Sequence, residues 1–280
     1  MRAGKIHRGL IKLFFLALAA LFFGACGLLV GEPFIDPVPE ADITRHGNDR
    51  AEIYLRSYSP HDAFSQFTIF YRIYVSDVSI PATTTDTFPA INPILQQNFN
   101  SVYPFIDSDT LFGTNMHNLF SGINFRYLFL ANAANLTGTA LVEANVPVLS
   151  IDQVLGRSLF YRPNAELILE FDFSQSQQVP VLRIGSDEFI LLRAESHPGI
   201  GSFNPRPEHR RFINHDDLRE YDYINVNFNA DVANRAGLTG IDRRFTYVAM
   251  FIVGVGMNPL TFANVYSTPS LIHVFQIPDP

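Results

Sequence analysis

The densest group of side chains that could do chemistry lies between Arg206 and Glu220. His209 and His215 stand six positions apart in this segment. Imidazole and carboxylate groups together suit zinc or a similar ion, and guanidinium groups bind anions. The residues that such an anion or metal site would use are Arg206, His209, Arg210, Arg211, His215, Asp216 and Asp217.

The spacing of these residues matches neither the H-x-x-x-H pattern of one helical face nor a zinc-finger pair. An exposed loop whose opposite charges pair loosely explains the same composition, since each such pair contributes roughly 0–1 kcal/mol. We therefore expect no metal ion and no cofactor, and the seven residues stay as candidates for ligand binding.

No motif in the chain predicts a catalytic centre. The stretch from His197 to Ser202 has two glycines near a serine but is not G-x-S-x-G. Acidic pairs such as Asp216-Asp217 could flank a glycosidic bond, although such pairs are common in loops. We expect a protein that is not an enzyme. The alternative is a periplasmic hydrolase or carbohydrate-active protein that uses the His/Asp cluster at 209–217.

The first 26 residues have the layout of a secretory signal. Basic residues and no acidic ones precede the apolar run Leu13–Phe23, and the small pair Gly24-Ala25 leads into Cys26, the only cysteine of the chain. The apolar run is about half of the roughly 20 residues that cross a bilayer. A retained membrane anchor and a plain secretory signal are the alternatives to cleavage before an acylated cysteine.

A cysteine at this cleavage point resembles the lipobox of bacterial lipoproteins, which implies a diacylglycerol on Cys26 and palmitate among its acyl chains. Phe23 stands where most of these proteins carry Leu, a departure that fits the looser spirochaetal lipoboxes. The resemblance implies a signal peptide over 1–25 and a lipid-anchored protein of the cell envelope, at the outer membrane. It does not tell the periplasmic face from the surface face.

Composition removes several classes of function. Without Arg2, Lys5, Arg8 and Lys12, the chain has 16 arginines, no lysine and 27 acidic residues, a net charge of −11. Nucleic-acid binding is disfavoured because it depends on neutralised phosphates. A lysine Schiff base is excluded, and acylation of Cys26 removes the one thiol nucleophile. The apolar content of 47% and the 26 phenylalanines predict a folded core.

The segment 26–48 reads as an acylated cysteine followed by a tether. Pro33, Pro37 and Pro39 alternate with acidic residues there, and such segments stay extended. We expect the folded domain to span 49–280.

Period-two alternation predicts many short strands, clearest over Phe67–Val75. A short helix is expected over Pro93–Phe105, and Gly185–Glu188 reads as a hairpin connection. Together these elements predict an antiparallel all-β sandwich. The other expected strands are Glu52–Ser57, Phe125–Leu130, Ala140–Val148, Glu166–Phe173, Val181–Ile184, Phe189–Ala194, Tyr223–Asn229, Phe245–Val255 and Ser270–Ile277.

Three segments carry a resemblance to fibronectin type III and related immunoglobulin-like sandwiches. Tyr71–Tyr74 is similar to the central strand of that family, and Tyr247–Val253 with Ser267-Thr268-Pro269 is similar to its last two strands. Residues of about 77–244 would then be an insertion or a second domain. The whole chain, which ends in Tyr266-Ser267-Thr268-Pro269 and then Val274–Pro278, also resembles a set of uncharacterised spirochaetal lipoproteins.

These observations predict a lipid-anchored envelope or surface lipoprotein that acts as a non-enzymatic binding module. Its partners would be the membrane, through the lipid on Cys26, and a protein or carbohydrate ligand.

Overall fold

The structure is a computed structural model, and it describes a set of segments between residues 35 and 277. No described helix is long and apolar enough to cross a membrane. The described ranges are 35–55, 64–76, 78–81, 84–88, 91–96, 125–132, 154–156, 158–160, 167–174, 179–196, 210–213, 231–234, 245–258 and 264–277.

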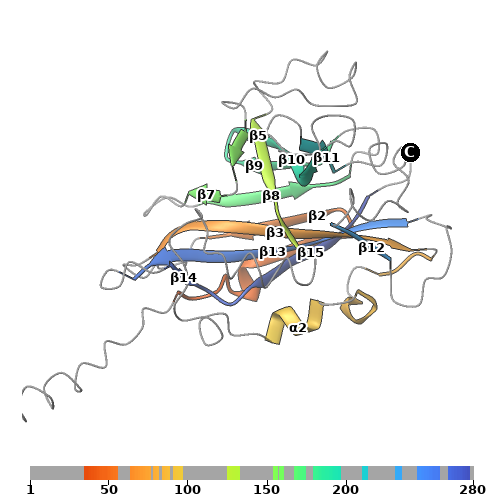
Figure 1. The fold of residues 1–280 in the computed structure, drawn as a ribbon, viewed down its shortest axis with the longest axis horizontal. Helices are drawn as coiled ribbons and strands as arrows, with labels where there is room; N and C mark the ends of the chain where they lie inside the picture. The colour runs from red at the N-terminus through yellow and green to blue at the C-terminus, as the bar shows by residue number, and fades with distance from the viewer. Residues whose placement is uncertain are drawn as a thin grey trace, which may run out of the picture. The chain divides into compact units, whose positions relative to one another are not determined.

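The described part of the chain is an all-β sandwich of two antiparallel sheets, which confirms the expected fold class. Figure 1 shows the sheet that contains β8, β9 and β10 stacked over the sheet that contains β3 and β13. We call these sheet 1 and sheet 2.

Sheet 1 runs in the order β1-β2-β8-β9-β10-β5-β6, with β11 also paired to β10. Its hairpin β9–β10 turns at Gly185 and Ser186, and Gly185 has a φ of 63°, a conformation that glycine adopts without strain. The expected hairpin is thus confirmed. The strands are β1 (Ile43–His46), β2 (Arg50–Tyr54), β5 (Phe129–Asn132), β6 (Val154–Gly156), β8 (Ile168–Asp172), β9 (Val181–Ile184), β10 (Asp187–Ser196) and β11 (Arg210–Phe212).

Sheet 2 is built on two paired strands of thirteen residues, β3 (Phe64–Ser76) and β13 (Phe245–Met257). Shorter strands pair along their outer edges, and β12 is the one that runs parallel to its partner β3 in the described part. These are β4 (Arg126–Tyr127), β7 (Ser158–Phe160), β12 (Val232–Asn234), β14 (Asn264–Tyr266) and β15 (Ser270–Ile277).

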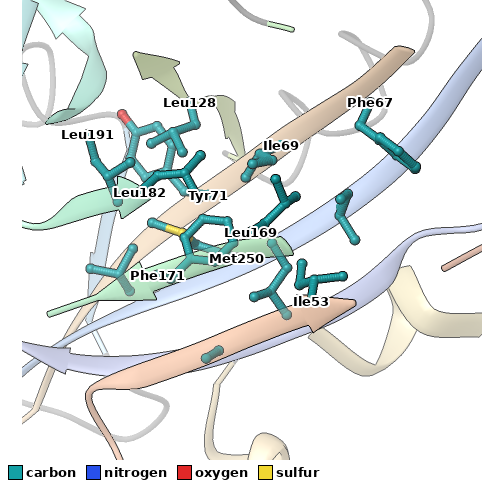
Figure 2. Packing of buried hydrophobic residues seen from close by; sticks show 14 of the residues in the cluster. Ile53, Phe67, Ile69, Tyr71, Leu128, Leu169, Phe171, Leu182, Leu191 and Met250 are labelled. Carbon is teal, nitrogen blue, oxygen red and sulfur yellow. The ribbon is translucent and has the colours of Figure 1, made fainter. Parts of the chain in front are cut away.

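The main core lies between the sheets, where alternate residues of each strand meet. Figure 2 shows Ile53, Leu169 and Phe171 of sheet 1 in the same apolar cluster as Ile69 and Met250 of sheet 2. All five are at most 2% exposed. Their burial supplies the main stabilisation of the fold, since apolar burial is worth roughly 25 cal/mol per Å².

The outer face of sheet 2 is also buried, so β13 is covered on both sides over nearly all its length. Two short 3-10 turns, η1 (Glu40–Asp42) and η2 (Thr85–Thr87), accompany the one described α-helix, α2 (Ile91–Gln96). Phe88 lies between Tyr74 and Tyr247, with ring centroids 5.2 and 5.3 Å away, and Ile91 joins the same cluster. Figure 1 shows α2 on the side of sheet 2 that faces away from sheet 1. The helix expected over Pro93–Phe105 corresponds to α2, which begins two residues earlier, at Ile91. Residues 97–105 lie outside the described ranges.

The middle of the chain belongs to the sandwich. Strands β5, β6, β8, β9, β10 and β11 all lie between residues 77 and 244, and they form sheet 1 together with β1 and β2. In the described part, this region therefore completes the sandwich instead of forming a second domain.

The expected tether is corrected over residues 35–48. Ile35 and Val38 are 1% and 3% exposed and belong to the main core, and Ser270 Oγ donates to the Val38 carbonyl at 2.7 Å. Strand β1 then pairs with β2. The prolines made this segment look extended, but its apolar residues find a place in the core. Residues 27–34 are outside the described ranges.

Candidate functional site

Three polar side chains meet inside the sandwich and form what we call the buried polar cluster. Tyr71 comes from β3, Arg193 from β10, and Asp231 immediately precedes β12. Each is fully buried, at 0% exposure. Arg193 and Asp231 form a two-pronged ion pair, with Nε to Oδ2 at 2.8 Å and Nη2 to Oδ1 at 2.5 Å.

Tyr71 connects this ion pair to the backbone. Its hydroxyl donates to Asp231 Oδ2 at 2.7 Å and accepts the Ala194 amide hydrogen at 2.6 Å. The Asp231 carbonyl accepts the Ile73 amide hydrogen at 2.9 Å. Because Arg193 belongs to sheet 1 and Tyr71 to sheet 2, the cluster joins the two sheets through charged hydrogen bonds, which are about twice as strong as neutral ones.

The cluster is built to hold the fold and offers little to a substrate. The carboxylate of Asp231 is engaged by Arg193 and Tyr71, and none of the three side chains is exposed to solvent. A general base must reach the proton that it removes from a substrate. The geometry therefore assigns the cluster a structural role.

A second polar group, the surface charge cluster, lies on the outer face of sheet 1. Its centre is Arg183 of β9, which donates from Nη1 to Glu170 Oε1 and Asp172 Oδ2, both at 3.1 Å, and from Nε to Glu188 Oε2 at 3.0 Å. Arg50 of β2 approaches Asp172 at 3.5 Å. The register accounts for this row, because Glu170 and Glu188 are both cross-strand partners of Arg183.

Asp172 is the most engaged carboxylate of the surface charge cluster. Partial burial alone would raise its pKa, but hydrogen bonds from the Ser174 hydroxyl at 2.6 Å and the Ser174 amide at 2.9 Å, with that from Arg183, bring the pKa below its ordinary value. Asp172 therefore stays ionised at neutral pH. Arg183, Glu170 and Glu188 are 36–44% exposed, so the cluster is open to a partner.

The residues proposed from the sequence fall mostly outside the described ranges. Arg210 and Arg211 lie in strand β11, whose backbone pairs with β10, where a loop was expected. The described ranges do not include the other candidates, Cys26, Arg206, His209, His215, Asp216 and Asp217. Ile213 lies in the main core just after β11, and Asp231 immediately precedes β12.

No group of three His, Cys, Asp or Glu side chains in the described residues is arranged to hold a metal ion. Burial raises the pKa of Tyr74 to about 12, against the nearby Arg72, so this phenol stays protonated at neutral pH.

Sequence reasoning missed the buried polar cluster, although one signal for it was present. Arg193 follows Phe189-Ile190-Leu191-Leu192, and strand alternation places it on the same face as Phe189 and Leu191, which point into the core. An inward-facing arginine needs a buried partner. Nothing in the sequence identified that partner as Asp231.

Comparison with known proteins adds no relative. No protein-family model matches the chain, and no curated protein or solved structure is significantly similar to it. The resemblances to fibronectin type III modules and to spirochaetal lipoproteins stay predictions.

Proposed function

We propose that this protein is a lipid-anchored lipoprotein of the bacterial cell envelope whose sandwich acts as a non-enzymatic binding module. The observation that carries the proposal is the N-terminal sequence, in which basic residues, the apolar run Leu13–Phe23 and the small pair Gly24-Ala25 lead into Cys26. Two or three acyl chains on Cys26 would anchor the chain stably, because each buried methylene contributes roughly 0.8 kcal/mol.

The surface charge cluster is the part of the described surface best suited to a polar ligand. Its charged residues stand on the paired strands β2, β8, β9 and β10. Surface ion pairs contribute only about 0–1 kcal/mol each. Arg183, Glu170 and Glu188 can therefore exchange their mutual contacts for contacts with a protein or carbohydrate at little cost. The excess of carboxylates in the cluster favours a partner with basic or hydroxyl groups.

Chain geometry limits where such a module would work. Ile35, the first described residue, is a core residue nine positions after Cys26. At no more than about 3.6 Å per residue, these positions span at most about 32 Å. An acylated Cys26 would therefore keep Ile35 within about 32 Å of the bilayer, so the ligand would be met close to the membrane surface.

Acylation is tested with Cys26→Ser expressed beside the wild-type chain in a bacterium that is fed a palmitate analogue. We expect label on the wild-type protein and its partition into a detergent phase, and neither for Cys26→Ser. The control Ser57→Ala removes a side-chain hydroxyl elsewhere in the chain and should keep the label. An unlabelled, aqueous wild-type protein would refute the lipid anchor.

Whether the protein lies on the surface face or the periplasmic face of the envelope is tested by protease treatment of intact and permeabilised cells, followed by immunoblotting. Cleavage in intact cells favours a surface ligand. Protection until permeabilisation places the module in the periplasm.

The binding role is tested separately from the anchor, with purified chain lacking residues 1–26 on arrays of envelope proteins and glycans. If a ligand binds at least tenfold more weakly to Arg183→Ala than to the wild-type chain, the result supports the surface charge cluster as the binding site. Replacing His209, His215 and Asp216 together with Ala should leave that binding unchanged. Hydrolysis of an array substrate that disappears in the triple variant would instead favour the enzymatic alternative.

A further inference from the structure

The turn between β1 and β2 is fastened to strand β15 of the opposite sheet. The Gln276 amide donates to the Asn48 carbonyl at 2.6 Å, and His273 Nε2 lies 3.0 Å from the Gly47 carbonyl. A carbonyl only accepts, so Nε2 carries the hydrogen and donates it.

Arg45 adds a second attachment at the same edge. Its guanidinium donates from Nε to the Ile272 carbonyl at 2.8 Å and from Nη2 to the Leu271 carbonyl at 2.6 Å, where a register shift interrupts the pairing of β15 with β13. Glu40 of η1 pairs with Arg45. The turn and Arg45 thus occupy hydrogen-bonding groups of an edge strand that would otherwise be open to another strand.

His273 is the titratable member of this contact, and its surroundings disfavour a charge. The side chain is 2% exposed, and its ring meets Phe275 edge-on, with centroids 5.0 Å apart. Phe275 in turn stacks on Phe173, the residue that follows β8, with ring centroids 4.3 Å apart. The charged groups that act on His273 are Arg45 from β1, which opposes protonation, and Asp49 from the turn, which favours it.

We propose that His273 and the β1–β2 turn form an acid-sensitive latch, in which protonation of His273 releases the turn from β15 and opens this edge of the sandwich while β3 and β13 stay paired. The latch stands on the geometry of the described residues and does not depend on the lipid anchor.

The direction of the pH effect on the latch follows from the pKa of His273. Burial lowers the pKa of His273 to about 4, with Arg45 adding to the effect and the Gly47 carbonyl opposing it, while an open latch restores the ordinary value of 6.5. The open form thus binds the proton more tightly. Its population is unaffected above pH 6.5 and rises as the pH falls toward 4. Between pH 7.5 and pH 5.0 the opening equilibrium should rise roughly 30-fold.

The test is hydrogen exchange of single amides by NMR, corrected for intrinsic rates at each pH. The Gln276 amide, bonded to Asn48, and the Phe173 amide, bonded to the Asp49 carbonyl at 2.8 Å, report on the latch. The Ile73 amide, bonded to Asp231, reports on the rest of the sandwich. We expect exchange at Gln276 and Phe173 to accelerate roughly 30-fold from pH 7.5 to 5.0 and that at Ile73 to change less than threefold.

The variant His273→Gln can keep a donor near the position of Nε2 and does not titrate, so it should abolish the acceleration. His46→Gln is the matched control, because His46 belongs to the same strand as Arg45 but is half exposed beside Glu52. It should behave as wild type. If His273→Gln fails to fold, the pH titration of the His273 ring signals in the wild-type protein still measures the pKa of His273. An ordinary His273 pKa, equal acceleration at Ile73, or acceleration that persists in His273→Gln would each overturn the latch.

Discussion

Two Asp–Arg pairs of this protein have similar chemistry and opposite surroundings. Asp231 and Arg193 are both 0% exposed and meet at 2.5–2.8 Å inside the sandwich. In the surface charge cluster, Asp172 is 6% and Arg183 is 36% exposed, and they meet at 3.1 Å. Water can replace the partner of Arg183 but cannot reach Arg193. The buried Arg193–Asp231 pair therefore joins the two sheets, whereas the Arg183–Asp172 pair lies at the surface and contributes little to stability.

The largest expected effect comes from breaking the buried pair with Asp231→Ala. Arg193 would be left as a buried charge without its carboxylate, and removing one partner of a buried pair costs about 3–5 kcal/mol. Urea unfolding followed by circular dichroism measures the loss. A loss below about 1 kcal/mol would mean that water reaches Arg193, and the contrast between the two pairs would disappear.

Removing both charges sharpens the same comparison. The double variant Arg193→Met/Asp231→Leu has no unpaired charge and should recover most of the stability lost in Asp231→Ala, because apolar replacements of buried ion pairs are often neutral. Urea unfolding of both variants in the same buffer gives the difference. A double variant no more stable than Asp231→Ala would show that the contribution of the cluster lies in its shape and hydrogen bonds.

A smaller loss is expected for Tyr71→Phe. The change keeps the ring in the core but removes the hydroxyl that joins Asp231 to the Ala194 amide. An unsatisfied buried donor or acceptor costs about 1–3 kcal/mol. Differential scanning calorimetry should show a lower midpoint. The control Tyr54→Phe removes a hydroxyl bonded to the partly exposed Glu52 and should change the midpoint little.

The smallest effect is expected for Arg183→Ala, which removes the centre of the surface charge cluster. Glu170, Asp172 and Glu188 would gain water in place of the guanidinium, so the free energy of unfolding should fall by at most about 1 kcal/mol. The loss should shrink further in 0.5 M salt, because exposed charges are screened. If the free energy of unfolding falls as much as in Asp231→Ala, the surface pair and the buried pair contribute equally to stability, and the contrast between them is wrong.

Much of the strand pattern was predictable because side chains alternate along a half-buried strand. The expected Val181–Ile184 and Ser270–Ile277 match β9 and β15 residue for residue, and Phe67–Val75 lies within β3. One expected strand, Phe125–Leu130, proved to be two, because the chain pairs with β3 in sheet 2 at Arg126–Tyr127 and with β10 in sheet 1 from Phe129 onward. The apolar run Tyr127–Ala131 continues across that change of sheet, so no local pattern marks where the chain leaves sheet 2.

The candidate sites were less predictable, because residue types say little about the partner of a side chain. Polar density drew attention to 206–217, which lies largely outside the described ranges. The buried polar cluster combines residues 38 and 160 positions apart in the chain. Each member alone reads as an ordinary strand or loop residue.

The sequence by itself determined the period of the strands, the tight turn at Gly185, the negative charge and the layout that ends at Cys26, since each depends on neighbouring residues. Tertiary structure alone decided that Ile35 and Val38 enter the core, that Arg193 meets Asp231 and that His273 fastens the β1–β2 turn. These depend on which strands lie opposite one another. That choice is made by packing of the whole chain, because a local pattern fixes the face of a strand and leaves its partner open.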